Sequence, residues 1–412
     1  MTTSSPRPPA PTPAPVRSTG HPPTPAPFRR GQRVVVLGAG YAGLMAALRL
    51  APHARVTLVD PADRFTERVR HHERTATSAP TARDLSLARM LRGTGVRHLA
   101  HRATALDPAA RLITTDDGRT LPYDRLVYAL GSHTGPPPAG TPTTPADDRV
   151  FTAESADALR ARLIGRPHHH NGLPATGSPR TLAVVGGGLT GVEMAAELAE
   201  SHPDWHIRLL SAGDVVAGHS PRGRAHVRAT LTALGVRVEE GVQVDDPGTV
   251  DADLVLWAAA MAPSTELAAG AGLALDPGTG RIAVDATLRS LSHPDIHAVG
   301  DAAAAHSPRG GTLRMGCATA LPTGSHAASV LIAESRGRQP EPLRFGYVIQ
   351  CVSLGRHDGV IQFVHPDDSP RDRVLTGRRA AFVKERVVRF TVHSLGLARR
   401  FPAAVPRVTG MG

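Results

Sequence analysis

Two short stretches of the sequence share an unusual pattern. Residues 34–48 read VVVLGAGYAGLMAAL, and residues 182–196 read LAVVGGGLTGVEMAA. In each stretch an apolar run gives way to three glycines spaced G-x-G-x-x-G, and apolar residues then return at helical spacing. Such a turn between a buried strand and a helix leaves room for a phosphate group at the helix N-terminus. Two copies therefore predict two nucleotide-binding units, and a chain of 412 residues is long enough for both.

The first turn carries the residues that a dinucleotide site needs. Gly38 permits the tight turn, Gly40 lets a phosphate approach the backbone, and Gly43 lets the helix pack close to the strand. A second strand follows and leads into Asp60, at the position where a carboxylate accepts hydrogen bonds from ribose hydroxyls. The alternatives are a purely structural turn and a solvated loop acid.

The second turn repeats this arrangement with one difference. Its glycines are Gly186, Gly188 and Gly191. The position equivalent to Asp60 is about Ser211, which is not acidic. Three arginines lie nearby in the sequence: Arg208, Arg222 and Arg224. A carboxylate would favour the free 2′-hydroxyl of NADH, whereas a neutral residue among arginines tolerates the 2′-phosphate of NADPH. Both nucleotides stay open as the second ligand.

Two further segments complete the pattern. LPYDRLVYALGS (residues 121–132) is an apolar strand that runs into a turn at Gly131, and HPDIHAVGDA (residues 293–302) is a strand that ends in Gly300 and Asp301. The four motifs, in this order over residues 32–335, resemble the flavoproteins with two dinucleotide-binding domains. Among these the chain is most similar to the type II NADH dehydrogenases and their FAD-dependent relatives. The resemblance implies an α/β fold with two Rossmann-like domains, FAD as cofactor, and NADH or NADPH as co-substrate.

The resemblance also implies roles for individual residues. FAD is expected at Gly38, Gly40, Gly43, Asp60, Gly131, Gly300 and Asp301, and NAD(P)H at Gly186, Gly188 and Gly191. Glu193, in the motif TGVE, is the candidate for positioning the nicotinamide ring against the flavin. A helix expected over about residues 321–334 would direct its N-terminus at the flavin, with Thr319 and Ala320 beside it. Glu197 is expected to be a capping or solvent-facing acid.

The pattern divides the chain into five parts. They are a proline-rich disordered tail (residues 1–30), a first FAD-binding part (31–150), an NAD(P)H-binding domain (151–263), a second FAD-binding part (264–335) and a C-terminal segment (336–412). The tail lacks the continuous apolar stretch of a secretory signal, and no run of about 18 apolar residues predicts a membrane span. The C-terminal segment predicts a hairpin and then a basic amphipathic helix at residues 380–401. That helix either lies on a membrane surface or packs on the flavin domain or on a dimer partner.

The basic composition does not predict a nucleic-acid partner. The formal net charge of +11 comes almost entirely from arginine, since Lys384 is the only lysine, and aromatic residues make up 3% of the chain. Cys317 and Cys351 are too few for a disulfide framework and predict a cytoplasmic protein, with or without contact with the inner face of the cell membrane. The two cysteines also allow a comparison with the sulfide:quinone reductases, which use cysteines beside the flavin. The favoured interpretation is that they are two small buried thiols.

Two groups of charged residues are assigned to loops rather than to sites. The histidines at residues 168–170 predict a solvated loop and no metal site. Arg68, Arg70, His71 and His72 predict a charged surface loop, with contact to the flavin as the alternative.

These features together predict an enzyme in which FAD takes a hydride from NAD(P)H and passes electrons to a quinone or another small acceptor. The helix after Asp301 lacks the glutamines that type II dehydrogenases carry near the quinone, so the acceptor stays open. Two other functions stay open as well. One is a reductase for a ferredoxin-like protein partner, and the other is a non-catalytic redox sensor that binds nucleotide.

Overall fold

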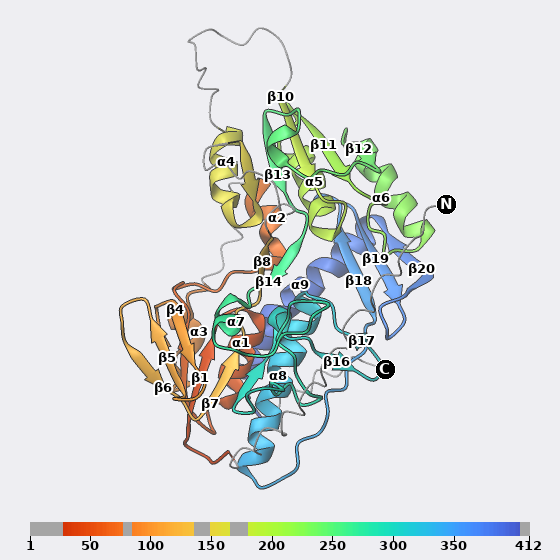
Figure 1. Cartoon of the computed structure of the whole chain (residues 1–412). Helices are drawn as coiled ribbons and strands as arrows, with labels where there is room; N and C mark the ends of the chain where they lie inside the picture. The colour runs from red at the N-terminus through yellow and green to blue at the C-terminus, as the bar shows by residue number, and fades with distance from the viewer. Residues whose placement is uncertain (1–27, 77–84, 136–148, 165–179, 404–412) are drawn as a thin grey trace, which may run out of the picture.

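Two parallel five-stranded sheets form the two halves of the molecule (Figure 1). The computed structural model describes residues 28–76, 85–135, 149–164 and 180–403. Most of the predicted tail and the histidines at 168–170 lie outside these residues. The strand orders are β15-β7-β1-β2-β3 and β12-β11-β10-β13-β9, and every pairing within these two sheets is parallel. The predicted α/β fold with two Rossmann-like units is confirmed.

The first sheet is assembled from two distant parts of the chain. Its strands are β1 (Arg33–Leu37), β2 (Arg55–Val59), β3 (Arg97–Leu99), β7 (Arg125–Tyr128) and β15 (Ile296–Ala298). All ten residues of α1 (Tyr41–Leu50) are buried, because α1 packs against α8 (Cys317–Ser335) and α9 (Gly377–Arg400). The chain thus leaves this sheet after β7 and returns to it only with β15.

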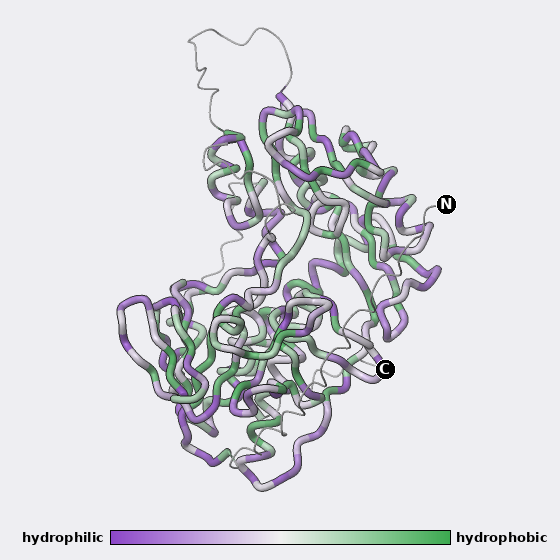
Figure 2. Tube along the Cα trace, viewed as in Figure 1, coloured by the Kyte–Doolittle hydropathy of each residue, from purple (hydrophilic) through white to green (hydrophobic). Residues whose placement is uncertain are grey.

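The second sheet is built from the intervening residues. Its strands are β9 (Val150–Thr152), β10 (Arg180–Val185), β11 (Trp205–Ser211), β12 (Arg237–Glu240) and β13 (Leu254–Trp257). The helices of this half are α4 (Ala156–Ile164), α5 (Leu189–Ser201) and α6 (Pro221–Ala233). The strands of both sheets are largely hydrophobic in Figure 2, as expected for parallel sheets covered on both faces.

Smaller elements join and flank the two sheets. They are the antiparallel sheet of β4 (Ala103–Asp107), β5 (Leu112–Thr115) and β6 (Thr120–Pro122), the pair β8 (Ser132–Thr134) and β14 (Met261–Pro263), and the pair β16 (His306–Ser307) and β17 (Gly311–Thr312). The short helices are α2 (His71–Ala76), α3 (Leu87–Leu91) and α7 (Glu266–Gly270), and single 3₁₀ turns cover Arg68–Arg70, Ala153–Ser155, Pro247–Thr249 and Gly300–Ala302.

The C-terminal segment confirms the predicted hairpin and helix. β18 (Ile349–Ser353) and β19 (Gly359–Val364) pair antiparallel, and β20 (Pro370–Thr376) adds a third strand that the sequence did not predict. α9 begins directly after β20 and packs against β19 and α1. No described helix is both long enough and apolar enough to cross a membrane.

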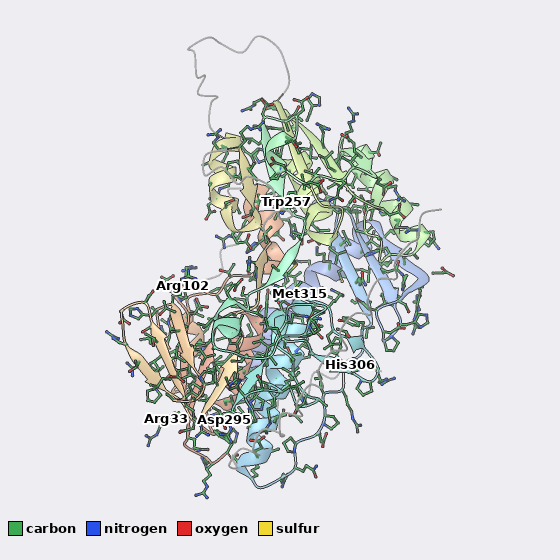
Figure 3. All side chains as sticks on the ribbon, in the orientation of Figure 1. Arg33, Arg102, Trp257, Asp295, His306 and Met315 are labelled. Carbon is green, nitrogen blue, oxygen red and sulfur yellow. The ribbon has the colours of Figure 1, made fainter. Side chains whose placement is uncertain are left out.

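The carboxyl ends of the two sheets face each other. Arg33, which begins β1, and Asp295, just before β15, lie at the lower edge of the first sheet in Figure 3, so these strands run toward the second sheet. Trp257, which ends β13, lies on the side of the second sheet that is nearer the first. In parallel α/β sheets the ligands bind beyond the carboxyl ends of the strands, so both glycine turns open toward the space between the sheets.

Candidate active site

The first glycine turn has the geometry of a phosphate cradle. Gly38 has a φ of +96°, and a Cβ there would lie 2.5 Å from the Ala129 carbonyl oxygen. A Cβ at Gly43 would lie 1.9 Å from the Gly38 carbonyl oxygen, whereas a Cβ at Gly40 would meet nothing within 4 Å. Gly38 and Gly43 are therefore required for packing, and Gly40 leaves open space above the start of α1.

The second turn repeats these relations around α5. Gly186 has a φ of +127°, and a Cβ at Gly191 would lie 1.8 Å from the Gly186 carbonyl oxygen. A Cβ at Gly188 would again meet nothing within 4 Å. Neither α1 nor α5 receives a side-chain hydrogen bond at its N-cap or carries an acid in its first turn. Free N–H groups beside open space fit a pyrophosphate at each turn.

The two turns differ in the residue that follows the second strand. The Asp60 carboxylate accepts a hydrogen bond of 2.6 Å from the Ala39 N–H and another of 2.9 Å from the Ala62 N–H. It is thereby fixed beside the first turn, where a ribose would lie. In the second half this position is occupied by Ser211, which ends β11.

Asp301 lies where three elements of the flavin half meet. Its carboxylate accepts a 2.7 Å hydrogen bond from the Ser132 hydroxyl, after β7, and a 2.7 Å hydrogen bond from the Gly316 N–H, before α8. Gly300, with a φ of +64°, donates its N–H to the Thr323 hydroxyl, and Gly131 has a φ of +73°. The structure thus brings Gly131, Gly300 and Asp301 together at the carboxyl edge of the first sheet.

The helix expected after Asp301 begins earlier than predicted. α8 starts at Cys317 rather than near residue 321, because Pro322 is accommodated within the helix. Thr319 and Ala320 are therefore buried in its first turn. The N-cap, Gly316, makes no side-chain hydrogen bond, so the α8 N-terminus keeps free N–H groups for a negatively charged group.

Glu193 forms a buried ion pair that the sequence did not predict. Its Oε1 accepts hydrogen bonds from the Lys384 ammonium of α9 and, at 3.0 Å, from the Ser353 N–H. Its Oε2 lies 3.6 Å from Nδ1 of His72 in α2. Burial opposes ionisation of the carboxyl, but the Lys384 charge outweighs burial and lowers the pKa of Glu193. Burial also lowers the pKa of His72 to about 4, so this imidazole is neutral at pH 7.

Two expectations about neighbouring charges are wrong. Glu197 is not solvent-facing: it is 1% exposed and pairs with Arg356 at 2.6 Å, because α5 packs against the β18–β19 hairpin. The segment containing Arg70 and His72 is not a surface loop, since both side chains are buried. Arg70 ends the 3₁₀ turn and pairs with Glu385 of α9, and His72 lies in α2, which packs on α5. Lys384 is the only lysine of the chain, which singles it out in the sequence. No sequence pattern, however, pairs it with Glu193.

Both cysteines are half-buried free thiols. Cys317 begins α8 and Cys351 lies in β18, and neither forms a disulfide. Burial raises the pKa of both thiols, that of Cys351 to about 12. Because the thiolate is the reactive form, this environment favours inert side chains over sulfur chemistry.

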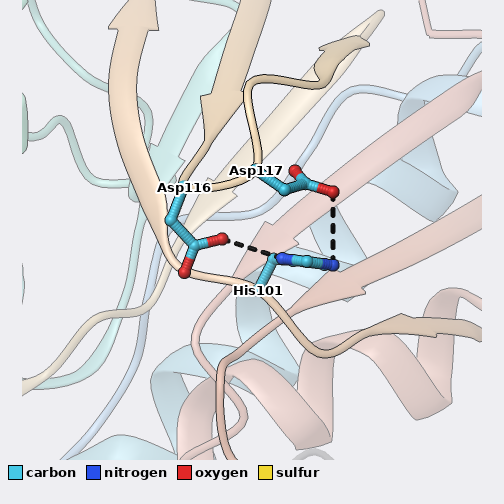
Figure 4. Close-up of side chains that lie close together, drawn as sticks. All are labelled: His101, Asp116 and Asp117. Atoms are coloured by element: carbon cyan, nitrogen blue, oxygen red, sulfur yellow. Dashed lines mark hydrogen bonds and ion pairs between the residues drawn. The ribbon is translucent and has the colours of Figure 1, made fainter.

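Two other charged groups are structural. His101 lies between two carboxylates, with Nδ1 2.8 Å from Asp116 and Nε2 3.4 Å from Asp117 (Figure 4). The three side chains are partly or fully exposed and already contact one another, and exposed acidic groups of this kind are common without an ion. Arg208, named above as a neighbour of the second ribose, instead pairs with Glu239 at 2.7 Å and donates to the Asp251 carbonyl.

Two glycine turns that open toward each other, each at an uncapped helix, define a flavoprotein with two dinucleotide-binding domains. Residues 32–327 match the model of the pyridine nucleotide-disulphide oxidoreductase family, and the chain belongs to this family. It is an NAD(P)H oxidoreductase with FAD as cofactor.

Relatives differ in how much of the chain they match. An NADH dehydrogenase-like protein of Mycobacterium tuberculosis is 32% identical over 78% of this chain and 86% of its own length. The alternative NAD(P)H-ubiquinone oxidoreductase C1 of Arabidopsis thaliana is 26% identical over 81% of this chain and 73% of its own. The ferredoxin–NAD(+) reductase component of the biphenyl dioxygenase system of Paraburkholderia xenovorans is 33% identical, over 52% of each chain.

Proposed function

We propose that this NAD(P)H oxidoreductase passes its electrons to a quinone, which it meets at a membrane surface on which α9 lies. The relative named as a ubiquinone oxidoreductase matches 81% of this chain, whereas the ferredoxin reductase matches 52%. A relative that matches most of the chain is the better guide to the acceptor, because the acceptor site involves more than the nucleotide-binding motifs.

The two faces of α9 carry this proposal. The inner face is buried and supplies Lys384 to the ion pair with Glu193. On the outer face, Phe382 and Phe390 are 67% and 57% exposed. Exposed arginines flank them: Arg378, Arg379, Arg386, Arg389, Arg399 and Arg400. Exposed aromatic rings among arginines are typical of a helix that lies in the interface of an anionic bilayer. One helix would then link the membrane surface to the buried charge centre.

Bound FAD supplies the redox chemistry, taking a hydride from NAD(P)H and returning two electrons to the acceptor. The chain's own groups have three tasks. The glycine turns and Asp60 hold the nucleotides, and the free N–H groups of α8 stabilise negative charge. Glu193 and Lys384 supply a buried carboxylate and a buried ammonium.

An acidic protein such as a ferredoxin is the second candidate acceptor. The six exposed arginines of α9 also suit an acidic partner, through electrostatic steering of the encounter. The exposed phenylalanines distinguish the two acceptors, since a bilayer needs apolar side chains and steering does not.

The test compares two surface changes in the FAD-loaded protein. Phe382→Ser with Phe390→Ser should reduce co-sedimentation with vesicles of phosphatidylglycerol at least fivefold. The same pair should lower turnover of a lipid-dissolved quinone relative to a water-soluble one. The control is Ile164→Ser on α4, which is 63% exposed and lies in the other half. Vesicle binding equal to that of the control, or turnover with a ferredoxin but no quinone, would contradict the proposal.

A further inference from the structure

We propose that the second glycine turn takes NADPH in preference to NADH. This rests on the proposed function only in that this turn binds the reducing nucleotide. Its basis is the charge around the position where the 2′ group of the adenosine ribose would lie, next to the end of β11. The carboxylates described there, Asp214 and Glu240, are already paired with arginines, and arginines suit a phosphate.

Backbone hydrogen bonds establish which residues are equivalent in the two halves. Gly38 donates its N–H to the Val59 carbonyl at 2.9 Å, and Gly186 donates its N–H to the Leu210 carbonyl at 2.8 Å. The next residue is Asp60 in the first half and Ser211 in the second. The acid that would recognise a 2′-hydroxyl and repel a 2′-phosphate is therefore absent from the second half.

There is also a steric reason for a small residue at this position. Ser211 is 4% exposed, and a Cβ on Gly187 would lie 2.0 Å from the Ser211 hydroxyl oxygen. The serine thus packs directly against the glycine turn. A hydroxyl at that place can donate to a phosphate oxygen without adding negative charge.

The nearest carboxylates are already engaged by cations. Glu240 pairs with Ser211 across the β11–β12 register, and it accepts hydrogen bonds from the Val215 N–H and from Arg228, each at 2.7 Å. The hydrogen bond and the charge of Arg228 lower the pKa of Glu240 and keep it ionised. A carboxylate held in this way competes poorly for a ribose hydroxyl.

Arg224 is held more loosely than Arg228, which is also bound to Glu240. Both contact Asp214, at 2.8 Å and 3.3 Å, and the Asp214 side chain is 50% exposed. Exposed ion pairs of this kind contribute at most about 1 kcal/mol. A 2′-phosphate carries more charge than Asp214 and accepts the guanidinium fork with two parallel hydrogen bonds. It can therefore displace the aspartate, while Arg222, which is exposed beside them at the start of α6, adds to the positive field.

Arg208 provides a matched control. It lies an odd number of residues before Ser211 on β11, so its side chain leaves the opposite face of the sheet, where it pairs with Glu239. Arg208→Gln therefore removes the same charge and the same donors as Arg224→Gln, at a place where no 2′-phosphate would lie.

The test measures kcat/KM for NADPH and NADH in the FAD-loaded protein, and the binding of 2′,5′-ADP and 5′-AMP by calorimetry. Wild type should favour NADPH at least tenfold. Arg224→Gln should lower the NADPH/NADH ratio at least tenfold, and Arg208→Gln should change it less than twofold.

A tenfold or greater preference of wild type for NADH would overturn the inference. So would an equal loss in the Arg224 and Arg208 variants, which would mean a general charge effect. If neither nucleotide reduced the flavin, the proposed function would fail. The binding of 2′,5′-ADP would then decide the present point alone: tighter binding than 5′-AMP supports it, and equal binding refutes it.

Discussion

The two glycine turns make the same backbone contacts, yet their surroundings differ. In the first turn, Tyr41 and Ala42 at the start of α1 are buried, as is the whole of the helix. In the second turn, Leu189 is only half-buried and Thr190 is exposed. Gly40 and Gly188 are both exposed, so the difference between the turns lies in the start of the helix that follows each of them. This difference suits a cofactor that stays and a co-substrate that exchanges.

The helices behind the turns differ in a second way. Counting from the third glycine of each turn, Met45 in α1 corresponds to Glu193 in α5. Met45 is fully buried among apolar residues, whereas Glu193 is bound by Lys384 of α9. The same position of the two helices therefore lies in an apolar core in α1 and in a charged cluster in α5.

The largest effects are expected from the third glycine of each turn. Gly43→Ala and Gly191→Ala each place a Cβ less than 2 Å from a carbonyl oxygen. Overpacking of this severity should lower the free energy of unfolding by roughly 3 kcal/mol. The outcomes should differ in kind: the Gly43 variant should lose FAD, whereas the Gly191 variant should keep FAD but no longer be reduced by NAD(P)H.

Flavin absorbance of the purified variants, before and after addition of nucleotide without oxygen, checks this contrast. Gly93→Ala is the control, because a Cβ there meets nothing within 4 Å and the residue lies far from both turns in the sequence; its φ of +79° limits the control to a small strain. Retention of FAD by the Gly43 variant would show that the first turn does not hold the cofactor.

The fold followed from local signals in the sequence. Each glycine turn combines an apolar strand, a fixed spacing and an apolar helix within about 20 residues, and such patterns need no knowledge of distant parts of the chain. The same reasoning placed Ser211 correctly as the counterpart of Asp60. It failed at the start of α8, because the helix begins before Pro322 and continues through it, whereas a proline inside a helix normally marks a break.

The charged centre could not be predicted because it depends on tertiary contacts. Glu193 and Lys384 are 191 residues apart, and no short-range pattern connects them. Arg208 was wrongly grouped with the residues near the second ribose, because it is close to Ser211 in the sequence. Its side chain lies on the other face of the sheet. Arg228, whose side chain contacts both Asp214 and Glu240, was missed because it lies a further turn along α6.

Replacing the buried ion pair by apolar residues would make α5 resemble α1 at the position of Met45. Lys384→Met leaves Glu193 buried without its cation, which should lower the free energy of unfolding by about 3 kcal/mol. Adding Glu193→Met, which copies Met45 of α1, should restore most of that stability, since a buried ion pair is often replaced by apolar residues at little cost. Flavin reduction should nevertheless stay slow in the double variant.

Urea unfolding of the two single variants and the double variant measures the coupling between the residues, and rapid mixing with NAD(P)H measures flavin reduction. Arg378→Met, at an exposed position of the same helix, controls for the loss of a positive charge. Reduction of the double variant at the wild-type rate would show that Glu193 and Lys384 are structural and take no part in positioning the nicotinamide.

A smaller effect is expected from the acid that the second half lacks. Asp60→Ala removes the carboxylate that the Ala39 N–H fixes beside the first turn, and with it the charge-assisted hydrogen bonds that the carboxylate would accept from the ribose, which contribute about 1.5–3 kcal/mol. FAD should therefore be held roughly 10- to 100-fold less tightly, as measured by flavin released on ultrafiltration. Asp63→Ala, an exposed acid three residues further on, should release no more flavin than wild type; equal release from both variants would remove Asp60 from the site.

The smallest effect concerns one buried histidine in each half. His297 of β15 is fully buried and His219 before α6 is 2% exposed, and no described residue is hydrogen-bonded to either ring. Burial lowers the pKa of His219 to about 4, and that of His297 well below its ordinary value near 6.5. The unfolded chain therefore binds the extra proton first, so stability is complete above pH 6.5 and falls as the pH drops below it.

Between pH 6.5 and pH 5 His219 should cost about 2 kcal/mol of unfolding free energy. His219→Leu and His297→Leu should each flatten the dependence of stability on pH in that window, because burial lowers the pKa of both rings in the folded state. Urea unfolding at pH 7, 6 and 5 tests this, with His306→Leu, an exposed histidine, as the control. If only one of the two variants flattened the curve, the other ring would have a partner in solution, and the two halves would differ in acid sensitivity as well as in the ligands that they hold.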